Sequence, residues 1–138
     1  MSANTQLRNS IRKQRLALSA DQQSRIAQKL LNLIRDSALF RQSRRIAFYQ
    51  ANGGEIDPAP LLEHAWQLNK ACYLPVVDDN GANHLYFAPV ERNTPFIRNR
   101  YQIDEPVHQA AQRCPAQELD LVLVPLVATD SAGNRLVM

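Results

Sequence analysis

Two loops in this sequence carry residue types that could bind a small molecule. The first, residues 50–55, contains two adjacent glycines that would let the backbone approach a ligand, and it ends in the carboxylate of Glu55. The second, residues 124–135, carries Asp130 and Arg135. Both loops follow expected strands, and ligands of open α/β sheets bind beyond the carboxyl ends of strands. We therefore expect opposite charges to meet at one edge of a sheet.

Each loop also has an ordinary structural interpretation. Paired glycines are typical of a tight turn, and residues 130–133 suit a type I turn. The sequence contains neither GxxxxGK[ST] nor GxGxxG, so no standard nucleotide motif supports a phosphate site. The histidines and cysteines of this sequence are not spaced as metal ligands, so no metal site is predicted. They are His64, His84, His108, Cys72 and Cys114.

The elements that would position the loops begin with two amphipathic helices in residues 1–45. Apolar residues recur at helical spacing from Leu7 to Leu18. Ser19 followed by Gln22 has the form of a capping box, which predicts a second helix running to about Asp36. That helix is expected to bury Ile26, Leu30, Leu33 and Ile34.

Short apolar runs then predict strands separated by one helix. Strands are expected at residues 45–50, 71–77, 84–87 and 119–124, a turn at 78–83, and mostly loop over 88–115. Asp57 and Pro58 are suited to start the intervening helix. The apolar run at 119–124 is typical of a central strand of a parallel sheet covered on both faces. Strand, helix and strand in this order predict an α/β fold.

Length and composition indicate one globular domain. The 138 residues, 45% hydrophobic and 21% charged, exclude a disulfide-stapled miniprotein, a collagen-like fibre and a wholly disordered chain. We expect one domain over 1–138, with a basic helical segment at 1–45 and a sheet-forming part at 46–138. No secretory signal is evident and no apolar run approaches ~20 residues, so we expect a cytoplasmic protein with reduced thiols.

The net charge of +3 is unevenly distributed. Residues 1–45 carry ten Lys or Arg against two Asp, whereas the rest of the chain has a balance of −5. This asymmetry favours an anionic partner for the first third of the chain. Phosphate on a small molecule, nucleic acid and the acidic remainder of the same chain are the three candidates.

Several motifs follow one another along the whole chain. They are Leu7-Arg8 before a basic helix, Leu18-Ser-Ala-Asp21, Gln50 with Gly-Gly-Glu-Ile56 after it, Leu74-Pro-Val76, Ile103-Asp-Glu-Pro106, and the run from Leu119 to Leu136 that includes Asp130 and Gly133-Asn-Arg-Leu136. Their order resembles that of the 5-formyltetrahydrofolate cyclo-ligases, also called methenyltetrahydrofolate synthetases. The run from Leu119 to Leu136 is the most specific part of the resemblance.

The resemblance implies a Rossmann-like three-layer α/β sandwich with a mostly parallel sheet. It also implies an enzyme that uses ATP and Mg²⁺ to close 5-formyltetrahydrofolate into 5,10-methenyltetrahydrofolate. By position in the motifs, Asn4, Arg8 and Arg135 would contact ATP, and Gln50 and Glu55 would contact the folate. Guanidinium groups suit phosphate because they can bind two oxygens at once. No catalytic residue is assigned.

This sequence departs from the family pattern at several positions. Asn4 replaces the usual lysine, Thr129 stands where phenylalanine is common, and Val137 stands where a glycine follows Arg-Leu. Met138 precedes the place of a glycine-rich Tyr-Tyr-Asp motif, so we expect the C-terminal portion of the fold to be missing. On this basis the 138-residue chain alone is expected to be inactive and to self-associate.

Two alternatives to an active cyclo-ligase remain open on the sequence. One is an inactive relative that still binds folate or nucleotide. The other is a small basic nucleic-acid-binding protein, which only the charge of the first third supports.

Overall fold

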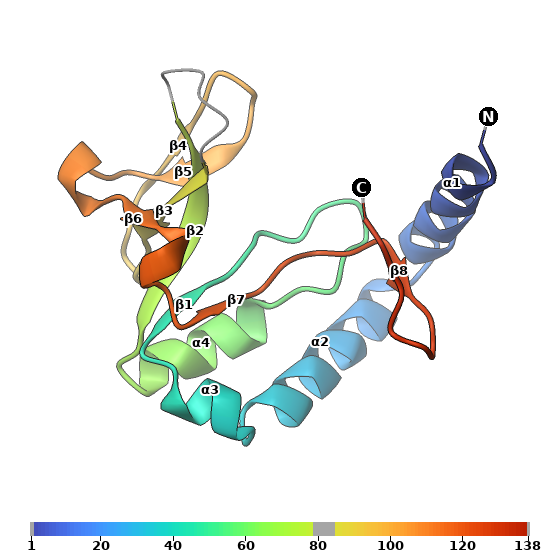
Figure 1. Cartoon of the computed structure of the whole chain (residues 1–138), viewed down its shortest axis with the longest axis horizontal. Coiled ribbons are helices and arrows are strands. Elements are labelled where there is room, and N and C mark those ends of the chain that lie inside the picture. The colour runs from blue at the N-terminus through green and yellow to red at the C-terminus, as the bar shows by residue number, and fades with distance from the viewer. Residues whose placement is uncertain (1, 79–84, 138) are drawn as a thin grey trace.

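The computed structural model describes residues 2–78 and 85–137 and has a helical half and a sheet half (Figure 1). The helices are α1 (Ala3–Leu16), α2 (Ala20–Ile34), α3 (Ala38–Gln42), α4 (Ala59–Gln67) and the short 3₁₀ turns η1 (Ala110–Gln112) and η2 (Ala116–Glu118). The strands are β1 (Arg45–Ala47), β2 (Ala71–Val77), β3 (Leu85–Pro89), β4 (Phe96–Arg98), β5 (Asp104–Pro106), β6 (Cys114–Pro115), β7 (Leu121–Val122), β8 (Ala128–Thr129) and β9 (Arg135–Leu136). The expected turn at 78–83 and His84 lie largely outside the described residues.

Local signals in the sequence set where α2 begins. The Gln22 backbone N–H donates to Ser19 Oγ at 3.1 Å, and the Ser19 N–H donates to Gln22 Oε1 at 2.9 Å. The predicted capping box is therefore confirmed. The buried positions of α2 are Ala27 and Leu31, whereas Leu33 is 79% exposed, so the expectation that Leu33 is buried was wrong. Two residues along a helix turn about 200°, which places Leu33 opposite Leu31.

The main sheet has five strands in the order β6-β3-β2-β1-β7. Strand β1 lies parallel to both β2 and β7, while β3 runs antiparallel to β2 and to β6. The α/β prediction is confirmed, and the parallel pairing is that of the three strands β2, β1 and β7. Because α4 connects the parallel pair β1 and β2, the loop after β1 emerges at the carboxyl edge of the sheet.

Helices α2, α3 and α4 cover one face of this sheet. The core on that face contains Leu31, Phe40, Ile46, Phe48, Leu61, Ala65, Cys72, Leu74 and Val90. A smaller cluster of Ala47, Phe87 and Cys114 lies on the opposite face. The alternation of buried and partly exposed residues along β2 matches this difference between the faces.

Residues 88–115 are mostly loop and turn, as expected, but they also contain strands that the sequence did not predict, because β4 and β5 form an antiparallel hairpin and β6 joins the main sheet. One expectation about a strand was wrong. The strand expected at 119–124 is reduced to β7, which lies at the end of the strand order among the described residues. Its two residues are only partly buried, and Val124 is 66% exposed.

The side chain of Asp120 explains where β7 begins. One carboxylate oxygen accepts hydrogen bonds from the backbone N–H groups of Arg44 and Arg45 at 2.8 and 2.9 Å. These bonds lower the pKa of Asp120. The aspartate that interrupts the apolar run thus anchors the run to the start of β1.

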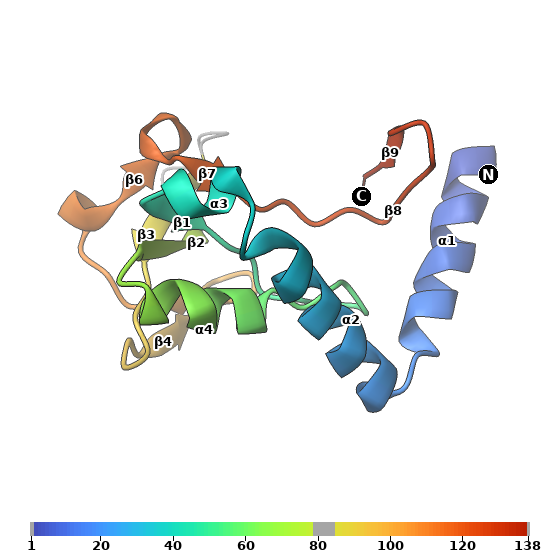
Figure 2. The same cartoon turned by 90° about the horizontal axis from the view of Figure 1, so that it is seen from below.

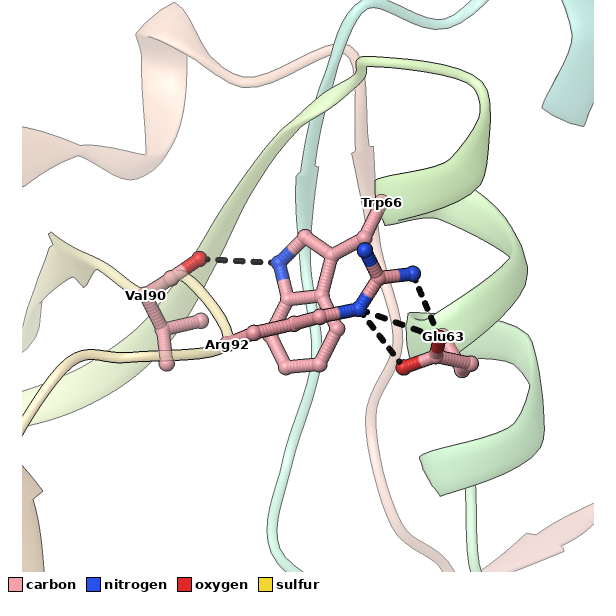
Figure 3. Close-up of polar contacts among 4 residues, drawn as sticks. All are labelled: Glu63, Trp66, Val90 and Arg92. Atoms are coloured by element: carbon pink, nitrogen blue, oxygen red, sulfur yellow. Dashed lines mark hydrogen bonds and ion pairs between the residues drawn. The ribbon is translucent and has the colours of Figure 1, made fainter.

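A polar cluster fixes the end of β3 to α4 (Figure 3). Trp66 donates its indole N–H to the Val90 carbonyl at 3.0 Å. The Arg92 guanidinium lies 5.8 Å from the Trp66 ring and forms an ion pair with Glu63 on α4. This anchor sets the start of the segment that leads to the β4–β5 hairpin.

Helix α1 stands at one end of the molecule beside the β8–β9 hairpin, and the main sheet stands at the other end (Figure 2). None of the α1 residues is buried. Within the part of the chain that the structure describes, no helix is long and apolar enough to cross a membrane.

Candidate functional site

The two ends of the chain meet in a groove between α1 and the β8–β9 hairpin. The groove has a volume of about 360 Å³, and both Asn4 and Arg135 line it, together with Asp130 and Asn134. The structure therefore brings together two of the three residues that the resemblance implies for ATP.

Arg8 contacts the end of the same hairpin. Its Nε donates to the Val137 carbonyl at 2.7 Å, which links the first helix to the residue after β9. The side chain lies one turn along α1 from Asn4. Arg8 is thus beside the groove and already uses one of its five donors within the protein.

The turn of the β8–β9 hairpin is organised by Asp130. Its carboxylate accepts the side-chain amide of Asn134 at 2.9 Å and the backbone N–H groups of Ala132 and Asn134 at 3.0 and 2.8 Å. Hydrogen bonding from Asn134 lowers the pKa of Asp130. The predicted turn is present, and its carboxylate shapes the loop that leads into Arg135.

Glu55 lies inside the loop that follows β1, not at its rim. The residue is only 7% exposed, and its Oε1 accepts the backbone N–H of Asn52 at 2.9 Å. The same loop carries Gly53 and Gly54 with φ of +61° and +80°. Glu55 therefore closes a turn that the two glycines make possible.

Gln50 is exposed and turned toward the β4–β5 hairpin. Its side-chain amide donates to the Asp104 carbonyl at 2.8 Å. It also lines a cavity of about 280 Å³ with Trp66, Arg92 and Phe96. The two residues implied for folate thus flank the same loop and contact different parts of the fold.

Sequence reasoning missed a larger apolar cleft between α2, the loop after β1 and the segment before β8. Its volume is about 450 Å³, and Arg15, Tyr49 and Gly54 are among its lining residues. The Tyr49 hydroxyl donates to the Ile56 carbonyl. Burial, followed by the charges of Glu55 and Asp57, raises the pKa of Tyr49 to about 12.

Arg15 had no distinguishing signal in the sequence. It is one of four basic residues in α1, and only the folded chain shows that it reaches the two loops singled out at the start. Among residues 2–78 and 85–137, no group of three His, Cys, Asp or Glu side chains could hold a metal ion.

Comparison with known proteins now places this arrangement in a family. The sequence profile described as the 5-formyltetrahydrofolate cyclo-ligase family matches residues 1–138. The chain belongs to this family. Its members include a 5-formyltetrahydrofolate cyclo-ligase of Haemophilus influenzae, 39% identical over 137 residues, with 96% of this chain and 71% of that protein covered. The cyclo-ligase of Escherichia coli K12 is 32% identical over 93% of this chain and 70% of its own length.

Solved structures of the cyclo-ligase family have the same fold. The 5,10-methenyltetrahydrofolate synthetase of Aquifex aeolicus superposes with a TM-score of 0.83 at 26% identity, covering 99% of this chain and 68% of that one. The synthetase of Mycoplasma pneumoniae gives a TM-score of 0.65 at 20% identity, covering 99% and 71%. At that identity, the second comparison supports the fold alone.

Proposed function

We propose that this protein catalyses the ATP-dependent cyclisation of 5-formyltetrahydrofolate to 5,10-methenyltetrahydrofolate. The expectation that the 138 residues alone are inactive is untested, and the turnover assay described below decides it. Family membership supports the reaction. The observation that carries the assignment of a site is the groove lined by Asn4 and Arg135, which come from opposite ends of the chain. The family resemblance implies that both residues contact ATP, and a groove lined by residues from the two ends of the chain agrees with that role.

The nucleotide would bind along α1 and the β8–β9 hairpin. Arg135 is exposed and Arg8 keeps most of its guanidinium donors, so both can donate to phosphate oxygens. Asn4 offers an amide where the family pattern has a lysine, and it supplies a hydrogen bond without a charge. We therefore expect the phosphate site to depend more heavily on the two arginines.

The folate would bind beside the loop after β1. The Glu55 carboxylate suits the N–H donors of a pterin ring, and one of its oxygens is held in place by the Asn52 N–H. Gln50 presents an amide at the start of the loop and is held by the Asp104 carbonyl. Both contacts fix the orientation of a polar group before substrate arrives, which is the condition for strong preorganised binding.

The reaction requires the formyl oxygen of the folate to lie in line with the γ-phosphate of ATP. The formyl oxygen attacks the γ-phosphorus of ATP and ADP leaves, which turns that oxygen into part of a good leaving group. The neighbouring folate nitrogen then attacks the formyl carbon and gives up its proton to the departing phosphate or to water, while the C–O bond breaks and phosphate leaves with the electron pair. The role of the protein is to hold the two reacting atoms together and to neutralise phosphate charge with its arginines.

Magnesium is expected with ATP, because Mg²⁺ at such sites is held largely by the phosphates and one or two carboxylates. The described residues offer no cluster of three candidate ligands, so we assign no step to the metal.

Three measurements test the proposal on the same preparation. They are equilibrium binding of 5-formyltetrahydrofolate, equilibrium binding of ATP, and the absorbance of methenyltetrahydrofolate formed with ATP and Mg²⁺. A cyclo-ligase gives all three, with one ADP released per product and no product without ATP. Binding without turnover identifies an inactive binder, and loss of all three signals contradicts the proposal.

A further inference from the structure

Helix α1 has no fully buried side chain to fix its position. It nevertheless carries Asn4 and Arg8, and its last turn contacts the loop after β1. We propose that Arg15 is a positioning residue for the cyclisation, which fixes the nucleotide-binding helix against the loop that carries Glu55. This inference rests on the proposed function.

Arg15 joins three segments that are distant in the sequence. Its Nη2 donates to the Gly53 carbonyl at 2.8 Å, and its Nη1 donates to the Leu126 carbonyl at 3.2 Å. Gly53 belongs to the loop with Glu55, and Leu126 lies just before the hairpin with Arg135. One guanidinium therefore connects the residues proposed for ATP with those proposed for folate.

Gly54 shows that the loop and the helix meet closely at Arg15. A Cβ atom built on Gly54 would lie 2.8 Å from the Arg15 Cβ, 3.0 Å from its carbonyl carbon and 3.2 Å from its carbonyl oxygen. The φ of Gly54, +80°, independently favours glycine. The second glycine of the pair thus lets the loop approach α1 itself.

Helix α2 also contacts Arg15, at its backbone carbonyl. The Gln23 side-chain amide donates to the Arg15 carbonyl at 3.3 Å. Arg15 Nε is buried and has no hydrogen-bond partner among the described residues. A buried donor without a partner is costly, so this placement of the guanidinium is maintained by its other contacts. The fork geometry of arginine suits two carbonyls that diverge, whereas lysine presents a single nitrogen.

A positioning role predicts a particular kinetic pattern. The nucleotide side and the folate side each keep their own contacts when Arg15 is changed, so each substrate should still bind. Their relative placement changes, and a misplacement of about 1 Å can reduce turnover by roughly 100-fold. The effect should therefore fall on kcat and leave both KM values nearly unchanged.

The principal experiment compares Arg15→Met with Lys13→Met in the full chain. Methionine keeps much of the aliphatic length and removes all donors. Lys13 is exposed on the same turn, and residues two apart on a helix do not share a face, so its variant is matched in helix and charge. We expect kcat to fall about 10- to 100-fold in Arg15→Met, with less than about a threefold change in either KM. Lys13→Met should resemble the wild type, and Arg15→Lys should recover part of the lost kcat.

Hydrogen–deuterium exchange provides a readout that does not require turnover. In Arg15→Met, amide exchange should increase in residues 52–56 and 124–129 and remain unchanged in β1 and β2. Gly54→Ala should produce the same pattern, because its methyl group displaces the helix from the loop. In the double variant Arg15→Met/Gly54→Ala, the fold-loss of kcat should be smaller than the product of the losses in the two single variants, as expected for residues in contact.

The outcomes separate the two proposals. If the wild type neither binds nor converts folate while the exchange pattern holds, the proposed function fails and Arg15 still holds the loop. If Arg15→Met leaves exchange and kcat unchanged, the positioning role is wrong. A selective rise in one KM also overturns it, since that result identifies a direct contact with one substrate.

Discussion

Glu55→Gln is the substitution that separates recognition of folate from folding of the loop. In the structure Glu55 Oε1 accepts the Asn52 N–H at 2.9 Å, and the residue is 7% exposed. Glutamine has the same shape and keeps a carbonyl oxygen that can accept this bond. It loses the negative charge, which the proposed contact with pterin N–H donors would use.

The expected magnitudes differ between glutamine and alanine. A hydrogen bond to a charged group contributes about 1.5–3 kcal/mol, so Glu55→Gln should weaken folate binding by roughly 10- to 150-fold. Its melting temperature should stay within about 2 °C of the wild type, because the bond to Asn52 remains. Glu55→Ala should weaken folate binding similarly and also lose the loop bond, at a cost of about 1 kcal/mol.

The assay is a titration with 5-formyltetrahydrofolate beside thermal unfolding of the same samples. Glu118→Gln is the matched control, since it removes a carboxylate whose partner is Arg45 at the start of β1, the opposite end of that strand from the loop. That variant should bind folate normally. A large loss of stability in Glu55→Gln with unaltered folate affinity would show that the carboxylate serves only the loop.

Three further changes test other parts of the molecule. Arg8→Ala should raise the KM for ATP more than that for folate in steady-state kinetics, and an equal rise in both would indicate that the side chain acts through its bond to Val137. Ser19→Ala should cost about 1 kcal/mol in urea unfolding by removing the capping box, whereas Ser24→Ala in the middle of α2 should cost nothing. Because the folded pKa of Tyr49 is raised from 10.0 to about 12, its contribution to stability is complete below pH 10 and is lost as the pH rises toward 12. Tyr49→Phe should therefore lessen the loss of stability in that window, and an unchanged pH profile would refute the assignment.

The features that the sequence predicted correctly depend on neighbours a few residues apart. The capping box at Ser19 requires only Gln22 and is present in the structure. Asp57 likewise accepts the Ala59 N–H at 2.9 Å, although the helix begins one position later than expected. The α/β class follows from the alternation of such local elements, and the structure and the family both confirm it.

The features that the sequence did not predict depend on partners far along the chain. The β4–β5 hairpin occurs in a proline-rich segment, where Pro106 occupies the end of a strand that needs no N–H at that position. Asp120 interrupts an apolar run, and its carboxylate accepts hydrogen bonds from two backbone N–H groups at the start of β1. Neither contact can be inferred from residue type and spacing, since each requires the tertiary fold to bring the partners together.

The paired glycines show how the same residues acquire a different meaning in the folded chain. In the sequence, Gly53 and Gly54 indicate either a turn or close approach of a ligand to the backbone. In the structure, the Gly53 carbonyl accepts from Arg15, and Gly54 meets the Arg15 backbone at a distance that leaves no space for a side chain. The loop therefore combines the residues proposed for folate with an attachment point for α1. Because none of the α1 residues is fully buried, such polar attachments help to place the residues proposed for phosphate, and a substitution at Gly54 should affect the proposed nucleotide side of the site as well as the proposed folate side.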